Sequence, residues 1–349
     1  MRFNRREVLG MLAGAALHAL AAEEKRSRLG VVIHSYAMRA AADRGREGTP
    51  PFSDPLRFLE YCGRLGAGGV QVAIGARDRA YVARLRGRAE ALGMFLEGSV
   101  RLPQDRADVD RFGAEVEAAK AAGAAVLRSA ILSGRRYETF RSAADFRQFT
   151  EQAYRSLTLA EPVVRRHEVR LAIENHKDWR ADELLGLLKR LGSPQVGVCV
   201  DTGNSIALLE DPMEVVEAYA PYAFSTHLKD MAVAEYEDGF LLAEVPFGEG
   251  FLDLKRMVGV LRRARPEVRF NVEMITRDPL KVPCLTRSYW ATFETLPGRH
   301  LADTLALVRK HAPKQPLPRV SDLPAEKRLE TEDQNVRRCL SFAREWLGL

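Results

Sequence analysis

Eight short apolar runs, separated by stretches with a helical period, constrain the fold of this chain more than any other feature. Most of the runs are continuously hydrophobic, which is typical of strands buried on both faces of a parallel sheet. Strand and helix alternating eight times predict an α/β fold, the (β/α)8 or TIM barrel, with a doubly wound sheet as the competing architecture. The count of eight and the placing of the polar residues favour the barrel. The predicted strands are Leu29–Ile33, Gly69–Ala73, Met94–Glu97, Ala124–Leu127, Val169–Glu174, Val196–Asp201, Ala223–Leu228 and Val268–Met274.

Composition and charge exclude several classes of protein. The chain has 349 residues, 46% of them hydrophobic and 29% charged, which suffices for one large barrel or two ordinary domains. A disordered tail protein and a disulfide-dense mini-domain are excluded. The formal net charge of +6 is spread along the chain rather than concentrated in a stripe, so nucleic acid is not an expected partner. The 4 cysteines form no C-x-x-C pair, which argues against a thiolate zinc site.

The first 22 residues have the pattern of an export signal. Arg5 and Arg6 precede an apolar run over residues 8–22, and residues 19–21 form an A-x-A cleavage pattern. The paired arginines favour the twin-arginine type, so we expect an exported protein, periplasmic or extracellular. An N-terminal amphipathic helix of the domain is the alternative. No other segment reaches about 18 consecutive apolar residues, so no membrane span is expected once the signal is removed.

The chain after the eighth predicted strand departs from the barrel pattern. Residues 277–298 have no clear period, and residues 303–311 predict a helix. Residues 314–324 are rich in proline and predict an exposed connector, followed by a last amphipathic helix over residues 326–347. We therefore expect a signal (1–22), a barrel (28–312), and a connector with a C-terminal helix packed on the barrel (313–349).

Four successive predicted strands end on side chains that can bind a metal ion. They are Glu174, Asp201, His227 and Glu273. In a barrel, residues at the carboxyl ends of the strands face the active site. A carboxylate after an apolar run is costly to bury without a cation, and four such ends in succession are hard to explain as helix caps or salt bridges. We therefore predict one divalent metal ion, Mn²⁺ first, with Mg²⁺, Co²⁺ or Zn²⁺ as alternatives.

At these residues the sequence resembles the sugar phosphate isomerase/epimerase family, the xylose isomerase-like barrel group. The segments LAIENH, VGVCVDTGNS, STHLKDM, VPFGEGFLDL and FNVEM carry the resemblance, which covers residues 29–276. It implies that the four residues at the strand ends are the metal ligands, and that Glu174 and Glu273 also move protons. Two positions depart from the family's pattern. Asn204 stands where several epimerases have histidine, and Gln71 stands where many members have a carboxylate.

The chemistry that the resemblance implies is proton abstraction next to a carbonyl. The metal stabilises an enediolate, while one glutamate takes a proton and the other returns it. The first interpretation is a keto-sugar isomerase or epimerase. The second is a lyase or dehydratase of the same fold that eliminates at the β-carbon of a 3-keto-glycoside or keto-polyol. The third is an exported sugar-binding protein without catalysis. A glycine-rich phosphate cradle is missing, so a phosphorylated substrate is not expected.

Three more side chains are predicted to bind substrate: His176, Lys229 and Asn204. The alternative for His176 is a place at the rim of the site. The alternative for Lys229 is a pair with Asp230 or Glu249. Each of these alternatives would leave the residue without a contact to substrate.

Five further positions leave two outcomes open. Arg128 could reach the pocket or form an outer salt bridge, and Glu97 could lie in the pocket or in a loop. Trp179, Tyr289 and Trp290 could stack on sugar faces, or pack in the core as most aromatic side chains do. Barrels of this kind often dimerise, so a homodimer is a further expectation from the fold.

Overall fold

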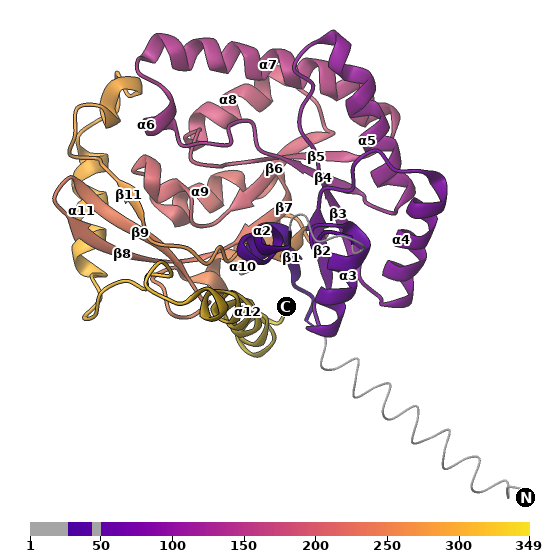
Figure 1. Ribbon diagram of the computed structural model, residues 1–349. Helices are drawn as coiled ribbons and strands as arrows, with labels where there is room; N and C mark the ends of the chain where they lie inside the picture. Colours follow the sequence, from indigo (N-terminus) through magenta and orange to yellow (C-terminus); the bar gives the residue numbers. More distant parts are fainter. Residues whose placement is uncertain (1–26, 44–49) are drawn as a thin grey trace, which may run out of the picture.

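Eight parallel strands close into a barrel, which confirms the predicted fold. The computed structural model describes residues 27–43 and 50–349, and the predicted signal lies outside them (Figure 1). Each predicted strand is present, the third and fourth ending further along the chain than expected. In spatial order the barrel strands are β1 (Gly30–Val32), β10 (Arg269–Val272), β7 (Ala223–Leu228), β6 (Val196–Asp201), β5 (Arg170–Glu174), β4 (Val126–Ser129), β3 (Phe95–Ser99) and β2 (Gly69–Val72).

Amphipathic helices cover the outside of the barrel, as Figure 1 shows. In α3 (Pro55–Arg64), the Asp54 carboxylate accepts hydrogen bonds from the first free backbone N–H groups, and proline holds the first helical position. Phe58, Leu59 and Cys62 then recur at helical spacing and are buried against the strands. The other helices of this layer are α4 (Arg79–Ala91), α5 (Val109–Ala121), α7 (Ala143–Arg166), α8 (Ala181–Leu191), α9 (Pro212–Tyr219) and α10 (Leu254–Ala264), with short α2 (Ala37–Ala42) and α6 (Arg136–Thr139) in the loops.

The predicted C-terminal helix is present as α12 (Ala325–Phe342), and it contributes to the barrel core. Val336, Cys339 and Leu340 are buried in the same hydrophobic cluster as the strands. Asp333 accepts a hydrogen bond from Tyr36 at 3.0 Å and another from Tyr61 of α3. The helix therefore lies against α2 and β10, with Asp333 reaching Tyr61 of α3.

A second, antiparallel sheet beside the barrel was not predicted. It consists of β8 (Asp230–Tyr236), β9 (Gly239–Val245) and β11 (Leu280–Val282), in the order β11-β9-β8. The helix α11 (Arg299–Lys310) packs on this sheet through a separate hydrophobic cluster that includes Val308. The sheet extends the carboxyl end of β7 and brings residues of the segment 277–298 back towards the barrel.

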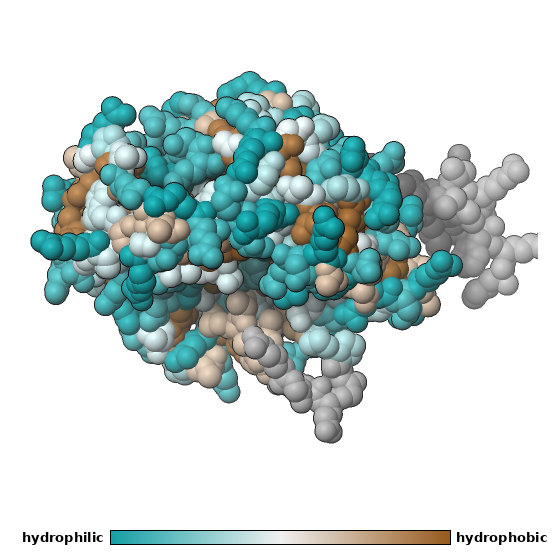
Figure 2. Space-filling model, turned by 90° about the horizontal axis from the view of Figure 1, so that it is seen from above, coloured by the Kyte–Doolittle hydropathy of each residue, from teal (hydrophilic) through white to brown (hydrophobic). Residues whose placement is uncertain are grey.

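The surface is mainly polar. Figure 2 shows one face on which hydrophilic side chains predominate and hydrophobic ones form small separate groups. No helix within the described part of the chain has the length and hydropathy needed to cross a bilayer. The predicted homodimer stays a prediction.

Glu210 is expected to make the stability of the fold depend on pH. Its carboxylate accepts a hydrogen bond from the Ala181 N–H, at the start of α8, and burial raises the pKa of Glu210 to about 7. Between the ordinary glutamate pKa and pH 7 the folded chain therefore holds a proton that the unfolded chain has lost. The free energy of unfolding should fall by roughly 3 kcal/mol as pH rises through this window.

Urea unfolding of the wild type and of Glu210→Gln checks this contribution. The glutamine cannot ionise and still offers an oxygen to Ala181. Its stability relative to the wild type should therefore increase from about pH 4 to about pH 8. A difference between the two proteins that does not change with pH would contradict the expectation.

Candidate active site

The structure brings the four predicted metal-binding side chains together. Glu174 ends β5, Asp201 ends β6, His227 lies near the end of β7, and Glu273 directly follows β10. One ligand atom from each lies within 4.8 Å of the others, and all four residues are buried. Asp201 and His227 are register partners of adjacent strands, so the parallel pairing itself sets them side by side.

His227 Nδ1 is the atom that tests whether these residues fit a metal ion. It is buried and has no hydrogen-bond partner among the described residues. It faces Glu174 Oε1 at 3.5 Å, Asp201 Oδ2 at 4.0 Å and Glu273 Oε2 at 3.4 Å. A ring nitrogen left this way in the interior is costly, whereas a divalent cation between the four groups would satisfy all of them. The donor set of three carboxylates and one imidazole therefore fits a divalent ion.

Two basic side chains hold the two glutamates in their ionised form. Lys229 Nζ lies 2.9 Å from Asp201 Oδ2 and 2.7 Å from Glu273 Oε2, and Arg128 Nε donates to Glu174 Oε2 at 2.6 Å. Burial alone would raise the pKa of Glu174, but Arg128 and His227 outweigh it and hold that pKa well below its ordinary value. Lys229 and His227 do the same for the pKa of Glu273. Both glutamates are thus ionised, as metal binding and proton acceptance require.

Gln71 determines which ring nitrogen of His227 carries the proton. His227 Nε2 lies 2.7 Å from Gln71 Oε1, an atom that can only accept. The Gln71 amide in turn donates to Glu97 at 3.0 Å, and Glu97 also accepts from Ser225 and Asn271. Burial alone would lower the pKa of His227, but the neighbouring Glu273 and Glu174 carboxylates hold it well above its ordinary value. The ring that binds a metal ion is the neutral one, in which Nε2 donates to Gln71 and Nδ1 keeps its lone pair towards the carboxylates. Glu97 lies neither in the pocket nor in a loop, but in the barrel interior.

Replacing Gln71 with leucine is expected to weaken metal binding about 10- to 100-fold, because His227 loses the acceptor that fixes its tautomer. Calorimetric titration of the metal-free protein with Mn²⁺ measures the change. Gln315→Leu is the matched control, since Gln315 is exposed in the connector. Equal Mn²⁺ affinity of Gln71→Leu and the wild type would show that the acceptor is dispensable.

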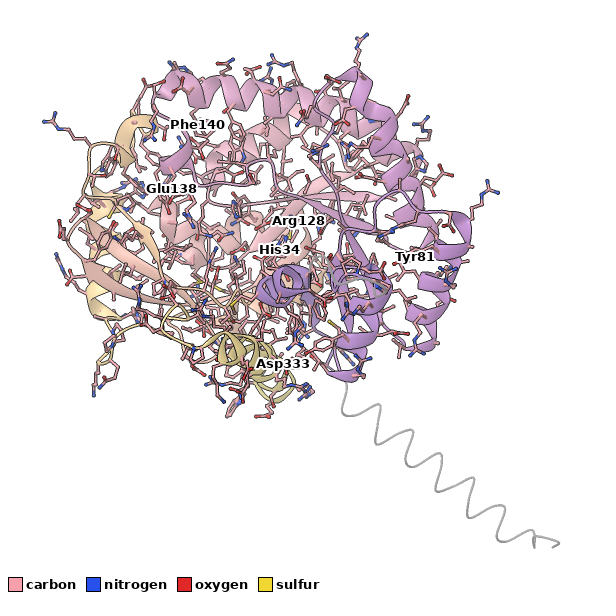
Figure 3. The ribbon with its side chains drawn as sticks, in the orientation of Figure 1. His34, Tyr81, Arg128, Glu138, Phe140 and Asp333 are labelled. Atoms are coloured by element: carbon pink, nitrogen blue, oxygen red, sulfur yellow. The ribbon has the colours of Figure 1, made fainter. Side chains whose placement is uncertain are left out.

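A cavity of about 440 Å³ lies over the metal-binding side chains. Glu174, Glu273, Lys229, His176 and Arg128 all line it. Arg128 thus reaches the pocket, where its partner is Glu174. Figure 3 shows Arg128 next to His34, which also lines the cavity, in the middle of the barrel.

The three predicted substrate-binding residues have different positions. His176 and Lys229 line the cavity, which their predicted role requires. Lys229 pairs with Asp201, Glu273 and Glu244 rather than with the partners suggested by the sequence. Asn204 is buried outside the lining, donates to Glu174 Oε1 at 3.4 Å and accepts from Lys229 at 3.4 Å. Its contact with substrate stays a prediction.

Sequence reasoning missed several residues of the site. His34 follows β1, and its Nδ1 lies 2.9 Å from Glu273 Oε1. Its place at a strand end was a signal that could have found it. Arg277 pairs with Glu244 of β9 across the unpredicted sheet, and Lys177 donates to Asn204 behind the cavity wall. These contacts depend on tertiary structure that no local pattern indicates.

The three aromatic candidates pack in the protein interior instead of lining the cavity. Trp179 is buried and stacks on Phe149, with ring centroids 5.2 Å apart. Tyr289 is buried against Phe293, and the Trp290 indole donates to the Cys284 carbonyl oxygen. The core-packing interpretation is therefore the better one.

Comparisons with known proteins agree with this fold. A 3-oxo-isoapionate decarboxylase from Pectobacterium atrosepticum is 28% identical over 223 residues, which are 62% of this chain and 76% of that protein. A D-psicose 3-epimerase from Clostridium cellulolyticum H10, solved with D-tagatose, has a TM-score of 0.57 and 13% identity, covering 91% of this chain and 98% of that one. A xylose isomerase-like protein from Mycobacterium smegmatis, solved with magnesium, has a TM-score of 0.54 and 14% identity, covering 79% and 97%. The family model of the xylose isomerase-like TIM barrel matches residues 59–288, and the chain belongs to this family.

Proposed function

We propose that this protein is a divalent-metal-dependent isomerase or epimerase of a keto-sugar. The observation that carries the proposal is the pair Glu174 and Glu273. Both are ionised and both line the cavity. One carboxylate oxygen of each faces His227 Nδ1, at 3.5 Å for Glu174 and 3.4 Å for Glu273, and this nitrogen has no hydrogen-bond partner among the described residues. Oxygen-rich donors support Mn²⁺ as the ion, and the Mycobacterium smegmatis protein of the same fold was solved with magnesium.

The side chains of the cavity can divide the work of moving a proton. Glu174, Asp201, His227 and Glu273 would hold the divalent ion, which would supply positive charge next to the substrate carbonyl. Glu273 takes the proton next to the substrate carbonyl, and His34, with 45% of its side chain exposed, links Glu273 to solvent. Because Glu174 is ionised in the resting site, it takes a proton from the solvent in the cavity before it returns one from the other carboxylate position, while Glu273 releases its own proton through His34. Lys229 donates to the developing oxyanion, and burial lowers the pKa of His176 to about 3, so its neutral ring orients a hydroxyl group.

A lyase is the second candidate, and the decarboxylase relative is the observation that favours it. Decarboxylation or β-elimination next to a carbonyl would pass through the same enediolate. The site would then need only one proton transfer, and the product would differ in mass from the substrate. An epimerase or isomerase leaves the mass unchanged.

Solvent hydrogen exchange tests the proposed function. The Mn²⁺-loaded protein is incubated in D₂O with a panel of keto-sugars and keto-sugar acids, and products are followed by NMR and mass spectrometry. Deuterium at the carbon next to the carbonyl, with the carbon skeleton intact, supports the isomerase or epimerase. Loss of CO₂ or water identifies the lyase. A protein that neither takes up a divalent ion nor exchanges hydrogen would rule out both and leave a sugar-binding protein.

Export is a further part of the proposal. Arg5, Arg6 and the apolar run after them support a twin-arginine signal, which would deliver the folded, metal-loaded protein to the periplasm or beyond. Cell fractionation with and without Arg5→Lys/Arg6→Lys tests it. The variant should accumulate inside the cell with its signal attached.

A further inference from the structure

The cavity over the metal-binding side chains is lined by more permanent cations than carboxylates. Its lining includes Arg101, Arg128, Arg277 and Lys229, against only Glu174 and Glu273. Both glutamates belong to the proposed metal set. A bound divalent ion would therefore leave the cavity with an excess of positive charge facing the substrate.

Two of the four lining cations are already engaged with the metal-binding carboxylates, and two are not. Arg128 donates to Glu174, and Lys229 bridges Asp201 and Glu273. Arg277 directs Nε and one terminal nitrogen at Glu244, at 3.1 and 2.7 Å, and 33% of its side chain is exposed. Its remaining N–H groups are free to bind a ligand.

Arg101 begins the loop after β3 and is exposed at the cavity. Its guanidinium forms no ion pair with any carboxylate in the described ranges. Asp108 is the carboxylate that feels its charge, without forming an ion pair with it. An arginine that forms no ion pair at the edge of a concave site attracts anions and discriminates against cations.

A separate observation behind the cavity wall points in the same direction. Lys177 is fully buried, and its ammonium group donates to the neutral Asn204 rather than to a carboxylate. Burial, together with the nearby charges of Lys229 and Arg277, lowers the pKa of Lys177 to about 7. Lys177, Lys229 and Arg277 thus lie on one side of the site, where Glu244 and Asp201 offset their repulsion only in part, and an anion bound there would reduce it further.

We infer that the substrate is an anion, a keto-sugar acid whose carboxylate binds the free N–H groups of Arg277, with Arg101 supplying the second positive charge. Guanidinium groups suit a planar carboxylate because their donors can meet both of its oxygens. The inference rests on the proposed function for placing the substrate's carbonyl at the metal-binding end of the cavity. It adds the chemical class of the substrate and the residues that select it.

Matched probes separate the charge from the sugar skeleton. D-Fructuronate differs from D-fructose only in carrying a carboxylate at the carbon farthest along the chain from the carbonyl, and D-tagaturonate and D-tagatose form a second such pair. Calorimetry on the Mn²⁺-loaded protein should give at least one acid an affinity about 10- to 100-fold above its neutral partner. Raising the salt concentration should weaken binding of the acid more than binding of the neutral sugar.

Arg277→Gln and Arg101→Gln should each reduce this preference, measured in each variant as the ratio of the acid's affinity to the neutral sugar's affinity. Arg106→Gln, an exposed arginine of the same loop region, is the matched control and should keep the preference. Circular dichroism checks that each variant is folded. Because Arg101 has no structural partner, its variant keeps the test valid even if Arg277→Gln fails to fold.

Several results would overturn the inference. Neutral sugars that bind as tightly as their acids, acids that fail to bind at all, or a preference that survives in both variants would each do so. Tighter binding of D-fructose 6-phosphate than of D-fructuronate would reassign the positive charge to a phosphate. Hydrogen exchange on neutral keto-sugars alone would contradict the inference that the substrate is an anion, and would still support the proposed isomerase or epimerase. Binding of the acids without metal uptake or hydrogen exchange would support an anionic ligand and contradict the proposed isomerase or epimerase.

Discussion

Replacing Glu273 with glutamine is expected to lower hydrogen exchange on the substrate by about 1,000-fold or more, and to weaken metal binding as well. The amide cannot accept the proton. It also removes one of three carboxylates that face His227 Nδ1, and it leaves Lys229 with one fewer anion at 2.7 Å. Metal content by mass spectrometry and deuterium incorporation by NMR measure the two losses on the same sample.

Glu267→Gln is the matched control for this variant. Glu267 precedes the same strand β10, is exposed, and pairs with Arg170 at 3.3 Å on the surface. Exposed ion pairs contribute little, so its activity and metal content should equal those of the wild type. Full exchange in Glu273→Gln with the metal retained would exclude Glu273 as the base and point to Glu174, the other glutamate that lines the cavity.

The barrel and the centre of its site were predictable because one physical rule sets both. A strand buried on two faces is mostly apolar, so a charged residue stands at the strand end unless, like Glu97 in β3, it has hydrogen-bond partners in the interior. Parallel strands place those ends at one rim of the barrel. The positions of Glu174, Asp201, His227 and Glu273 in the printed sequence therefore already indicated that they meet.

The second sheet was not predictable from the same rule. Only Lys229 separates β7 from β8, so no turn residue marks where the barrel strand stops and the new sheet starts. The pairing of Glu244 with Arg277 joins residues 33 positions apart, and depends on how β9 and the segment after β10 meet. Local sequence patterns do not contain that information.

The hydrogen-bond network around Gln71 could be predicted only in part. The sequence identified Gln71 as a departure from the family's pattern and left open whether Glu97 lies in the pocket or in a loop. It could not show that the two side chains are in contact. Register makes them neighbours, since Gln71 of β2 lies opposite Glu97 of β3. The carboxylate that Gln71 lacks is thus supplied one strand further round the barrel, through an amide that binds His227. Recognising this required the pairing of strands, not only their presence.

Replacing Asp230 with alanine is expected to cost about 4 kcal/mol of unfolding free energy, because four backbone N–H groups lose their acceptor. Asp230 Oδ2 accepts from Gly248 at 2.8 Å and from Gly250 at 3.1 Å, while Oδ1 accepts from Met231 at 2.9 Å and from Leu252 at 3.2 Å. One carboxylate thereby fastens the segment VPFGEGFLDL to the start of β8. Urea unfolding of the metal-free proteins measures the loss.

The glycines of that segment give the expectation a second, independent check. At Gly250 a side chain would collide with the Asp230 carboxylate, so Gly250→Ala should destabilise the fold through the same contact. The double variant should then lose less than the sum of the two single losses, because alanine at position 230 removes one of the two groups that a side chain at position 250 would strike, the other being the Met231 carbonyl oxygen. Asp238→Ala, at the exposed turn of the same hairpin, is the control. If Asp230→Ala is no less stable than this control, the four hydrogen bonds do not hold the segment in place, and the fixed position of neighbouring Lys229 at the metal-binding carboxylates needs another cause.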